Sequence, residues 1–152
     1  MLIIMRYFLL FFVVCSQAYA LDHASHPVQQ ASGSRQIKCP SRDFYEFMKV
    51  FSESKEVQIK FTKYPLKIQV LEDAEPEAKP VMRTFRRDQQ VSFPVIDNAI
   101  ERKQENLILQ IDWIKSNRAK LTMMKDDTCY VVNYFFVLNS CWSLVRIENW
   151  SH

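Results

Sequence analysis

The stretch CYVVNYFFVLNSCWSLVRIENW, residues 129–150, decides the fold of this chain. Its first half, residues 130–138, is apolar everywhere except at Asn133, which is typical of a central strand covered on both faces. Its second half, residues 141–149, reads as a further strand, and the polar pair Asn139-Ser140 between the two predicts a hairpin turn. The C-terminal part of the chain is therefore expected to belong to an antiparallel sheet.

The residues before this stretch keep a period of two, which places alternate side chains on opposite faces of a sheet. The apolar positions of the first such segment are Leu107, Leu109, Ile111 and Trp113. After a turn at Ser116-Asn117 the alternation continues over residues 119–123, and Asp126-Asp127 turns the chain again. These features predict a second hairpin that joins the first.

The first half of the domain combines helices with shorter strands. A helix is expected to begin at Ser41, because apolar residues then recur at helical spacing. Its apolar stripe consists of Phe44, Phe47, Met48 and Phe51. Residues 57–61 and 66–70 alternate as strands on either side of Pro65.

An acidic loop at residues 72–80 and a short strand at residues 81–88 follow. Ser92-Phe93-Pro94 is expected to open a second helix, since proline suits the first turn. The inner face of that helix would carry Val95, Ile96, Ala99 and Ile100. The pattern predicts an α+β domain, with an N-terminal helix and a second helix packed on a curved antiparallel sheet of about five to seven strands.

The N-terminal segment has the pattern of an export signal. Residues 1–20 combine Arg6, an apolar run and the small-residue end Ala18-Tyr19-Ala20, which predicts a cleaved signal peptide. The apolar run is shorter than the about 18 residues that span a bilayer, so no transmembrane anchor is expected after cleavage. Lipid attachment at Cys15 is not favoured, because the bulky Val14 precedes it. The expected location is secreted or periplasmic.

Residues 21–38 lack a hydrophobic period and predict a flexible tail before a single domain at residues 39–152. Cleavage after residue 20 would place His23 third in the chain. A terminal amine, two amides and an imidazole can form a square-planar site for Cu(II) or Ni(II). The simpler interpretation is that the position of this histidine is accidental.

Cleavage would also leave Cys39, Cys129 and Cys141, an odd number that predicts one disulfide and one free thiol. In the expected C-terminal hairpin, Cys129 and Cys141 lie roughly 30 Å apart, at ~3.3 Å per residue. A disulfide requires Cα atoms within ~7 Å. Cys39 is therefore expected to pair with either Cys129 or Cys141.

Composition excludes several classes of site. Gly33 is the single glycine and the three histidines lie near the termini, which argues against glycine-rich phosphate loops and histidine-centred sites within the domain. We therefore expect no cofactor and no metal in the domain. The formal net charge of +3 is too balanced to predict nucleic-acid binding.

Two polar residues on apolar strands are candidate ligand-binding residues. Asp112 would have a raised pKa suited to acid–base chemistry if the sheet enclosed it in a pocket. A solvent-facing carboxylate is the simpler interpretation. Asn133 is surrounded by apolar neighbours and needs hydrogen-bond partners, which could be a ligand or, more simply, a backbone group or water.

Charged residues supply the remaining candidates. Arg83, Arg86 and Arg87 form a tight basic cluster that could hold a carboxylate or phosphate, although pairing with the acidic segment Glu72–Glu77 is simpler. Arg146 and Glu148 are two residues apart and are expected to form a surface ion pair of small energy. The same period of two places them on one strand face with Trp142, Leu144 and Trp150.

The passages FYEFMKVFSESKEVQIKFTKYPLKI and YVVNYFFVLNSCWSLVRIENWS resemble an uncharacterised family of exported bacterial proteins. The matching positions are Phe44, Phe47, Phe51, Gln58, Pro65, Leu66, Trp142, Leu144, Ile147, Trp150 and Ser151. More loosely, the chain resembles the nuclear-transport-factor-two-like fold. That resemblance implies helices packed on a strongly curved sheet that can enclose a pocket. It implies no catalytic residue, and this fold hosts enzymes and non-enzymes alike.

These observations predict an exported, periplasmic, non-catalytic domain that binds an unknown protein or a small apolar ligand. One alternative is an inhibitor or immunity protein that blocks a secreted toxin or an envelope hydrolase. An exposed acidic loop at Glu72–Glu77 would favour that alternative. A second alternative is an enzyme that uses the Asp112 carboxylate.

Overall fold

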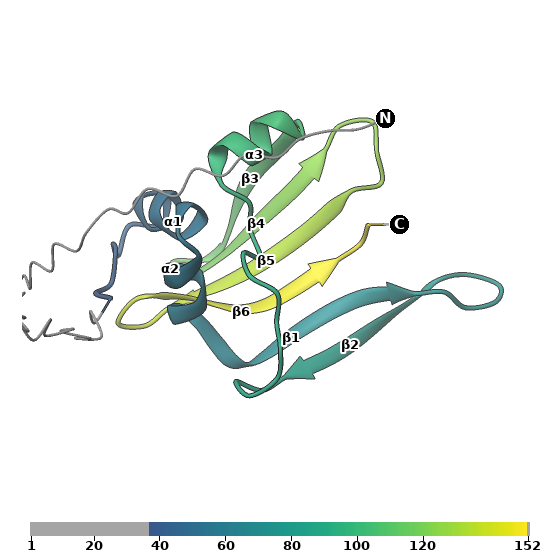
Figure 1. Ribbon diagram of the computed structural model, residues 1–152, viewed down its shortest axis with the longest axis horizontal. Helices are drawn as coiled ribbons and strands as arrows, with labels where there is room; N and C mark the ends of the chain where they lie inside the picture. The colour runs from purple at the N-terminus through teal and green to yellow at the C-terminus, as the bar shows by residue number, and fades with distance from the viewer. Residues whose placement is uncertain (1–36, 152) are drawn as a thin grey trace, which may run out of the picture. The chain divides into compact units, whose positions relative to one another are not determined.

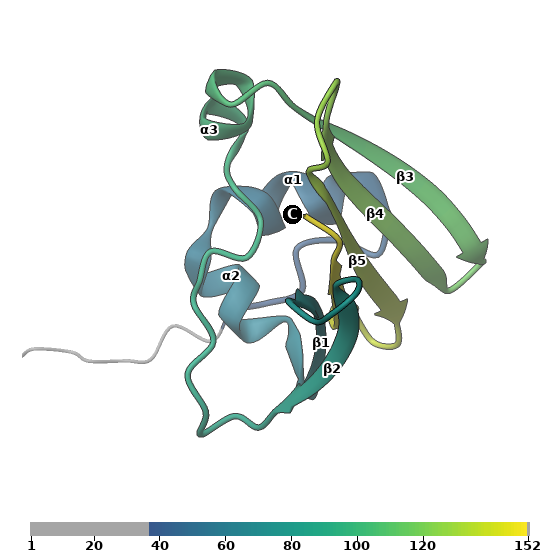
Figure 2. The same ribbon diagram turned by 90° about the vertical axis from the view of Figure 1, so that its right-hand side faces the viewer.

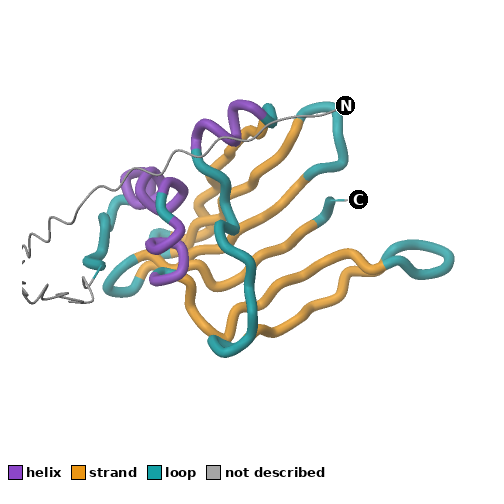
Figure 3. Tube along the Cα trace, viewed as in Figure 1, coloured by secondary structure: helices purple, strands orange, loops and turns teal. Residues whose placement is uncertain are grey.

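The computed structural model describes residues 37–151 as a layer of helices packed on one sheet (Figures 1 and 3). The predicted signal peptide, Cys15, His23 and most of the predicted tail lie outside these residues. In chain order the elements are α1 (Phe44–Glu53), α2 (Lys55–Lys60), β1 (Thr62–Glu72), β2 (Lys79–Phe85), α3 (Ala99–Gln104), β3 (Leu107–Lys115), β4 (Arg118–Lys125), β5 (Val131–Leu138) and β6 (Trp142–Asn149). Among the residues described, no helix is long and apolar enough to cross a membrane.

The sheet has six strands in the order β2-β1-β6-β5-β4-β3, and the α+β prediction is confirmed. Strands β1 and β6 run parallel, whereas the other neighbouring pairs are antiparallel. All three helices lie on one face of the sheet, which we call the inner face (Figure 2). The prediction that β5 is covered on both sides is therefore wrong, because its other face, the outer face, carries no helix.

The cap of helix α1 lies two residues after the predicted cap, Ser41. The cap is Asp43, whose carboxylate accepts a hydrogen bond from the Glu46 amide at 2.9 Å, while Ser41 accepts one from the Asp43 amide at 3.0 Å. A side-chain oxygen in this position satisfies an amide that the first helical turn leaves without a partner. The predicted apolar stripe of the helix is buried.

Aromatic rings fill the space between α1 and the sheet. The Phe44 ring lies 4.8 Å from that of Trp142 and 5.3 Å from that of Phe136, in edge-to-face arrangements. Phe47 and Phe51 continue the same cluster toward α2, and both are fully buried. Edge-to-face packing of this kind stabilises a core beyond its area burial.

Residues 55–60 form α2, so the strand predicted from Val57, Ile59 and Phe61 is wrong. Ser54 caps the helix by accepting a hydrogen bond from the Val57 amide at 3.3 Å. Six residues are too few for the period alone to separate a strand from a helix. The helix buries the adjacent residues Val57 and Gln58 against the core, which no strand could do on one face.

The second helix starts at Ala99 instead of residue 92. Asn98 caps it, accepting hydrogen bonds from the amides of Ile100 and Glu101, and Glu101 bonds back to the Asn98 amide. This reciprocal capping box is a stronger start signal than Pro94. Residues 92–98 instead form a loop along the helices (Figure 3).

The side chain of Gln58 binds the loop of residues 92–98 through three hydrogen bonds. Its side chain is fully buried and donates to the Ile96 carbonyl at 2.8 Å. Its carbonyl oxygen accepts from the amides of Val95 at 2.8 Å and Ile96 at 3.2 Å. One side chain thus satisfies three backbone groups that have no partner in regular secondary structure.

Tyr134, on β5, contacts the same loop of residues 92–98 from the sheet. Its phenol makes the free energy of unfolding depend on pH in alkaline solution. Its hydroxyl donates to the Val95 carbonyl at 2.7 Å, and burial raises the pKa of the phenol well above its ordinary value of 10.0. The unfolded chain releases this proton above pH of about 10 while the native chain keeps it, so stability falls as the pH rises through that range.

We expect Tyr134→Phe to cost about 1 kcal/mol at pH 7, the net value of one hydrogen bond. Above pH of about 10 the difference from the wild type should shrink, because the variant lacks the linked proton. Urea unfolding at neutral and alkaline pH measures both effects. A difference that stays constant with pH would contradict the assignment.

A bulge in β6 changes which of its residues face the helices. Phe136 lies opposite Leu144 but Phe135 lies opposite Arg146, so Val145 is an extra residue. An extra residue reverses the alternation beyond it. Arg146 and Glu148 consequently lie on the outer face, and the prediction that they share a face with Trp142 and Leu144 is wrong. Ile147 takes the buried position instead.

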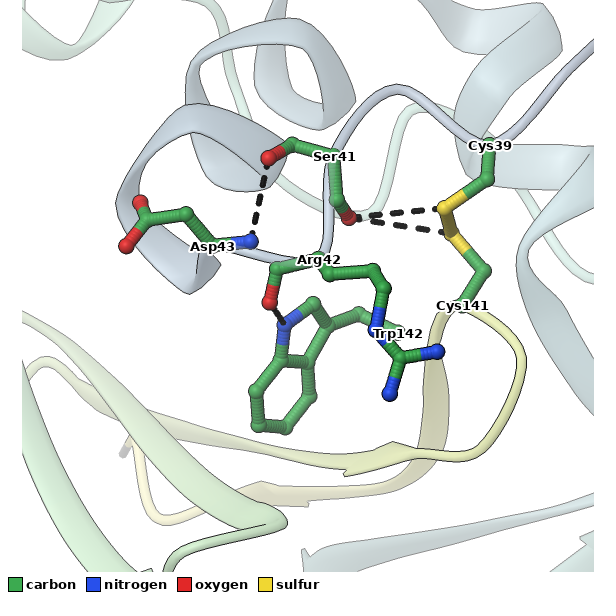
Figure 4. Close-up of a disulfide and its surroundings, with 6 residues drawn as sticks. All are labelled: Cys39, Ser41, Arg42, Asp43, Cys141 and Trp142. Atoms are coloured by element: carbon green, nitrogen blue, oxygen red, sulfur yellow. Dashed lines mark hydrogen bonds between the residues drawn. A yellow bond between two sulfur atoms is a disulfide. The ribbon is translucent and has the colours of Figure 1, made fainter.

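The structure contains a disulfide between Cys39 and Cys141, one of the two predicted alternatives, with Cα atoms 5.7 Å apart (Figure 4). The neighbouring Trp142 donates its indole N–H to the Arg42 carbonyl at 2.8 Å. The covalent bond and the hydrogen bond together attach the segment before α1 to the start of β6. Cys129 is exposed and free.

Candidate binding groove on the outer face of the sheet

The outer face of the sheet holds an open groove of about 580 Å³. Its floor is apolar and consists of Ile114, Phe135, Val137 and Val145. Its cationic side chains are Lys63, Lys67, Arg118 and Arg146. We call these eight residues the basic groove. Its volume is within the range of ligand-binding sites, about 300–1,000 Å³.

Strand register brings these residues together from distant parts of the chain. Lys67 lies beside Arg146 across the parallel β1–β6 pair, and Arg146 lies opposite Phe135. Arg118, the first residue of β4, lies opposite Val137. The alternation within β1 and the bulge in β6 turn the cationic residues to the outer face. The β6 bulge therefore creates one wall of the basic groove.

The charges of the groove are of one sign. None of the residues that line it is an aspartate or a glutamate. Arg146 is the cation held most firmly, since its guanidinium carbon lies 3.8 Å from the centroid of the Phe135 ring and its Nε lies 3.2 Å from Glu148 Oε1. The ion pair predicted for Arg146 and Glu148 is thus present.

The other three cations keep their charge available to a ligand. Lys63, Lys67 and Arg118 are exposed and form no ion pair with any residue in the range 37–151. Cations beside an apolar floor suit a ligand that carries carboxylate or phosphate groups next to apolar atoms.

Asp112 lies on the outer face beyond the groove and does not have the raised pKa that an enclosing pocket would give. Lys120 Nζ lies 3.0 Å from its Oδ2, and Gln110 donates to its Oδ1 at 3.2 Å. The hydrogen bond from Lys120, followed by that from Gln110, lowers the pKa of this exposed carboxyl group. The expectation of a desolvated acid is wrong, because the outer face leaves Asp112 open to solvent.

Asn133 also lies on the outer face, half-buried among its neighbours. Its Oδ1 accepts a hydrogen bond from the Thr122 hydroxyl at 2.8 Å. Register places it in a polar row across the sheet, made up of Gln69, Glu148, Asn133, Thr122 and Gln110. A protein side chain therefore satisfies Asn133, and this residue does not line the basic groove.

The three arginines of the predicted basic cluster do not converge on a site. Arg83 forms an ion pair with Glu72 across the β1–β2 hairpin. The Arg87 guanidinium lies 5.5 Å from the centroid of the Tyr64 ring. The Arg86 amide donates to the Gln89 side chain at 2.6 Å. None of them lines the basic groove.

Sequence reasoning missed the four cations of the groove as a set. The alternation of β1 already marked Lys67 as polar, and the start of β4 placed Arg118 just after a turn. No pattern within one strand states which strands are neighbours, however. The parallel β1–β6 pair joins residues about 80 positions apart, so the cluster becomes visible only once the sheet order is known.

Comparison with known proteins supports the fold. No family model and no curated protein matches the chain. Among solved structures, it is similar to an NTF2-like protein from Bacteroides fragilis NCTC 9343, with a TM-score of 0.53 and 16% sequence identity. The match covers 76% of this chain and 50% of the neighbour, so this chain spans about half of that protein's length. The similarity bears out the looser, NTF2-like resemblance at the level of fold.

Proposed function

We propose that this protein is an exported, non-catalytic binding domain that accepts an acidic protein segment in the basic groove. The observation that carries the proposal is the set of four cations around an apolar floor, with no carboxylate among the lining residues. A carboxylate ligand would replace the missing counter-charge of Lys63, Lys67 and Arg118. Hydrogen bonds between ionised groups are the stronger class of such contacts.

A small apolar ligand has less support. Aromatic side chains occupy the interior between α1 and the sheet, where such a ligand would be enclosed. A hollow beside α1 and β3, bordered by Met48, Leu109 and Ile111, measures about 170 Å³. That volume is below the usual range of ligand sites, which begins at about 300 Å³.

Export is part of the proposal because of two features of the chain. Residues 1–20 have the pattern of a signal peptide, and the Cys39–Cys141 disulfide is of a kind that persists in oxidising compartments. The resemblance to a family of exported bacterial proteins supports the same location. A periplasmic or secreted protein fits each of these features.

An inhibitor or immunity protein is the second candidate, and one observation favours it. The loop between β1 and β2 projects beyond the rest of the sheet and carries exposed carboxylates (Figure 1). Such a loop could enter a basic site on a toxin or hydrolase. An enzyme based on Asp112 has the least support, since this carboxyl group is ion-paired and exposed.

A direct test is binding of a fluorescein-labelled peptide of glutamates to the full chain, measured by anisotropy. We expect Lys67→Gln with Arg118→Gln to weaken binding at least about tenfold, because one lost charge-assisted hydrogen bond is worth about 1.5–3 kcal/mol. High salt should weaken wild-type binding too, since it screens exposed charges.

The matched control is Lys55→Gln with Lys103→Gln, which removes two exposed lysines from the helices on the inner face. It should bind the peptide as the wild type does. Equal loss in both double variants would show a general charge effect and contradict the proposal. Tighter binding of a labelled thymidine oligonucleotide than of the peptide would instead make the groove a nucleic-acid site.

A further inference from the structure

The tip of the β1–β2 hairpin has the charge that the basic groove lacks. We define this acidic tip as residues 73–78, DAEPEA, in which Asp73, Glu75 and Glu77 alternate with small apolar residues. The three carboxylates are exposed and form no ion pair with any residue that the structure describes. Figure 1 shows this loop extending past the ends of the neighbouring strands.

The acidic tip and the basic groove are complementary in number of charges and in composition. Three unpaired carboxylates on the tip correspond to three unpaired cations in the groove, Lys63, Lys67 and Arg118. The tip also carries Ala74, Pro76 and Ala78, which are small enough to lie on the apolar floor.

The tip of a molecule cannot reach its own groove. Lys67, the groove cation nearest the tip along β1, lies five residues before Glu72 at the end of the strand, so the strand holds these two residues apart by about 16 Å at ~3.3 Å per residue. Pairing with both β2 and β6 keeps this strand extended. An acidic tip that occupies a basic groove must therefore come from another molecule.

We propose that the acidic tip of one copy docks in the basic groove of a second copy. This inference rests on the proposed function of the groove as a site for acidic segments, and it names the segment. The groove lies beside the first half of β1 and the tip follows its last residue, so each copy offers one of each. Two copies can exchange tips about a two-fold axis and close as a dimer, or each contact can leave one tip and one groove open to further copies.

Sedimentation velocity on the full chain tests the inference with two neutralised variants. The tip variant is Asp73→Asn with Glu75→Gln and Glu77→Gln, and the groove variant is Lys67→Gln with Arg118→Gln. In ~0.1 M salt the wild type should associate further as its concentration rises, and ~1 M salt should reverse this through screening. Each variant alone should show at least tenfold weaker association.

An equimolar mixture of the two variants is the decisive sample. The groove variant keeps an acidic tip, and the tip variant keeps a basic groove, so one contact can form and no further contact can follow. We expect a 1:1 complex of fixed size. A control that neutralises the exposed acids Asp88, Glu105 and Asp126 should associate as the wild type does.

Two results would overturn the inference. One is a wild-type chain that stays monomeric up to about 1 mM, the weak end of specific association. The other is a groove variant that associates as well as the wild type, which would place the contact elsewhere. Binding of the glutamate peptide separates the two proposals. If the peptide binds the groove while the chain stays monomeric, the proposed function holds and the self-association does not.

Discussion

Replacing both Cys39 and Cys141 by serine is expected to lower the free energy of unfolding by about 4–5 kcal/mol, the loop-entropy value for a closed loop of about 100 residues. The two cysteines are 102 positions apart in the sequence, so the disulfide encloses nearly the whole domain. Without it, the unfolded chain gains the conformational freedom that the cross-link removes. The native state loses only a bond at the edge of the core.

Urea unfolding monitored by tryptophan fluorescence measures this loss, and reduction of the wild type should reproduce it. The reduced native fold retains a second attachment at the same place, because Trp142 still donates to the Arg42 carbonyl (Figure 4). Cys129→Ser is the control and should change stability by less than about 0.5 kcal/mol, since this thiol is exposed and free. A shift below about 1 kcal/mol on reduction would contradict the loop-entropy account.

The substitution Gln58→Ala is expected to lower the free energy of unfolding by about 3–5 kcal/mol. The substitution removes three hydrogen bonds at once and leaves the amides of Val95 and Ile96 and the Ile96 carbonyl without their partner. A buried polar group that loses its partner costs about 1–3 kcal/mol, and water entering the space would recover part of the total. The loop of residues 92–98 should open before the rest of the domain unfolds, because it loses these hydrogen bonds.

Thermal and urea unfolding measure the change in stability, and amide hydrogen exchange at Val95 and Ile96 locates it. Gln110→Ala provides the comparison, because Gln110 is an exposed glutamine on β3 and its removal should change stability by about 0.5 kcal/mol or less. Equal effects of the two substitutions would show that the buried contacts of Gln58 carry no special weight.

The strands of the C-terminal half could be predicted because each reports its own environment. Leu109 and Ile111 face the core while Gln110 and Asp112 face outward, as a period of two requires. The hairpin turns follow from local residues such as Ser116-Asn117, and β3 pairs with β4 across this turn. Each of these features depends on contacts between near neighbours in the sequence.

Predictions failed where a distant contact outweighed the local pattern. The alternation of residues 57–61 placed Gln58 on the polar face of a strand. Its hydrogen bonds to residues 37–38 positions away instead favour a helix that buries this one side chain. Arg146 was expected on the same strand face as Trp142 and Leu144, and a single extra residue in β6 turns it to the outer face. The bulge is a register shift between β5 and β6, and the sequence of β6 alone does not show where such a shift falls.

The sequence by itself determined the α+β class, the stripe of α1 and the exclusion of a disulfide between Cys129 and Cys141. These depend on periods and distances along one chain. Only the tertiary structure decided the order of the strands and the assembly of the basic groove. Lys67 and Arg146 become neighbours through the parallel β1–β6 pair, and no local pattern encodes a pairing between residues so far apart. Charge clusters on a sheet are therefore a property of the register, which folding sets by burying the opposite face.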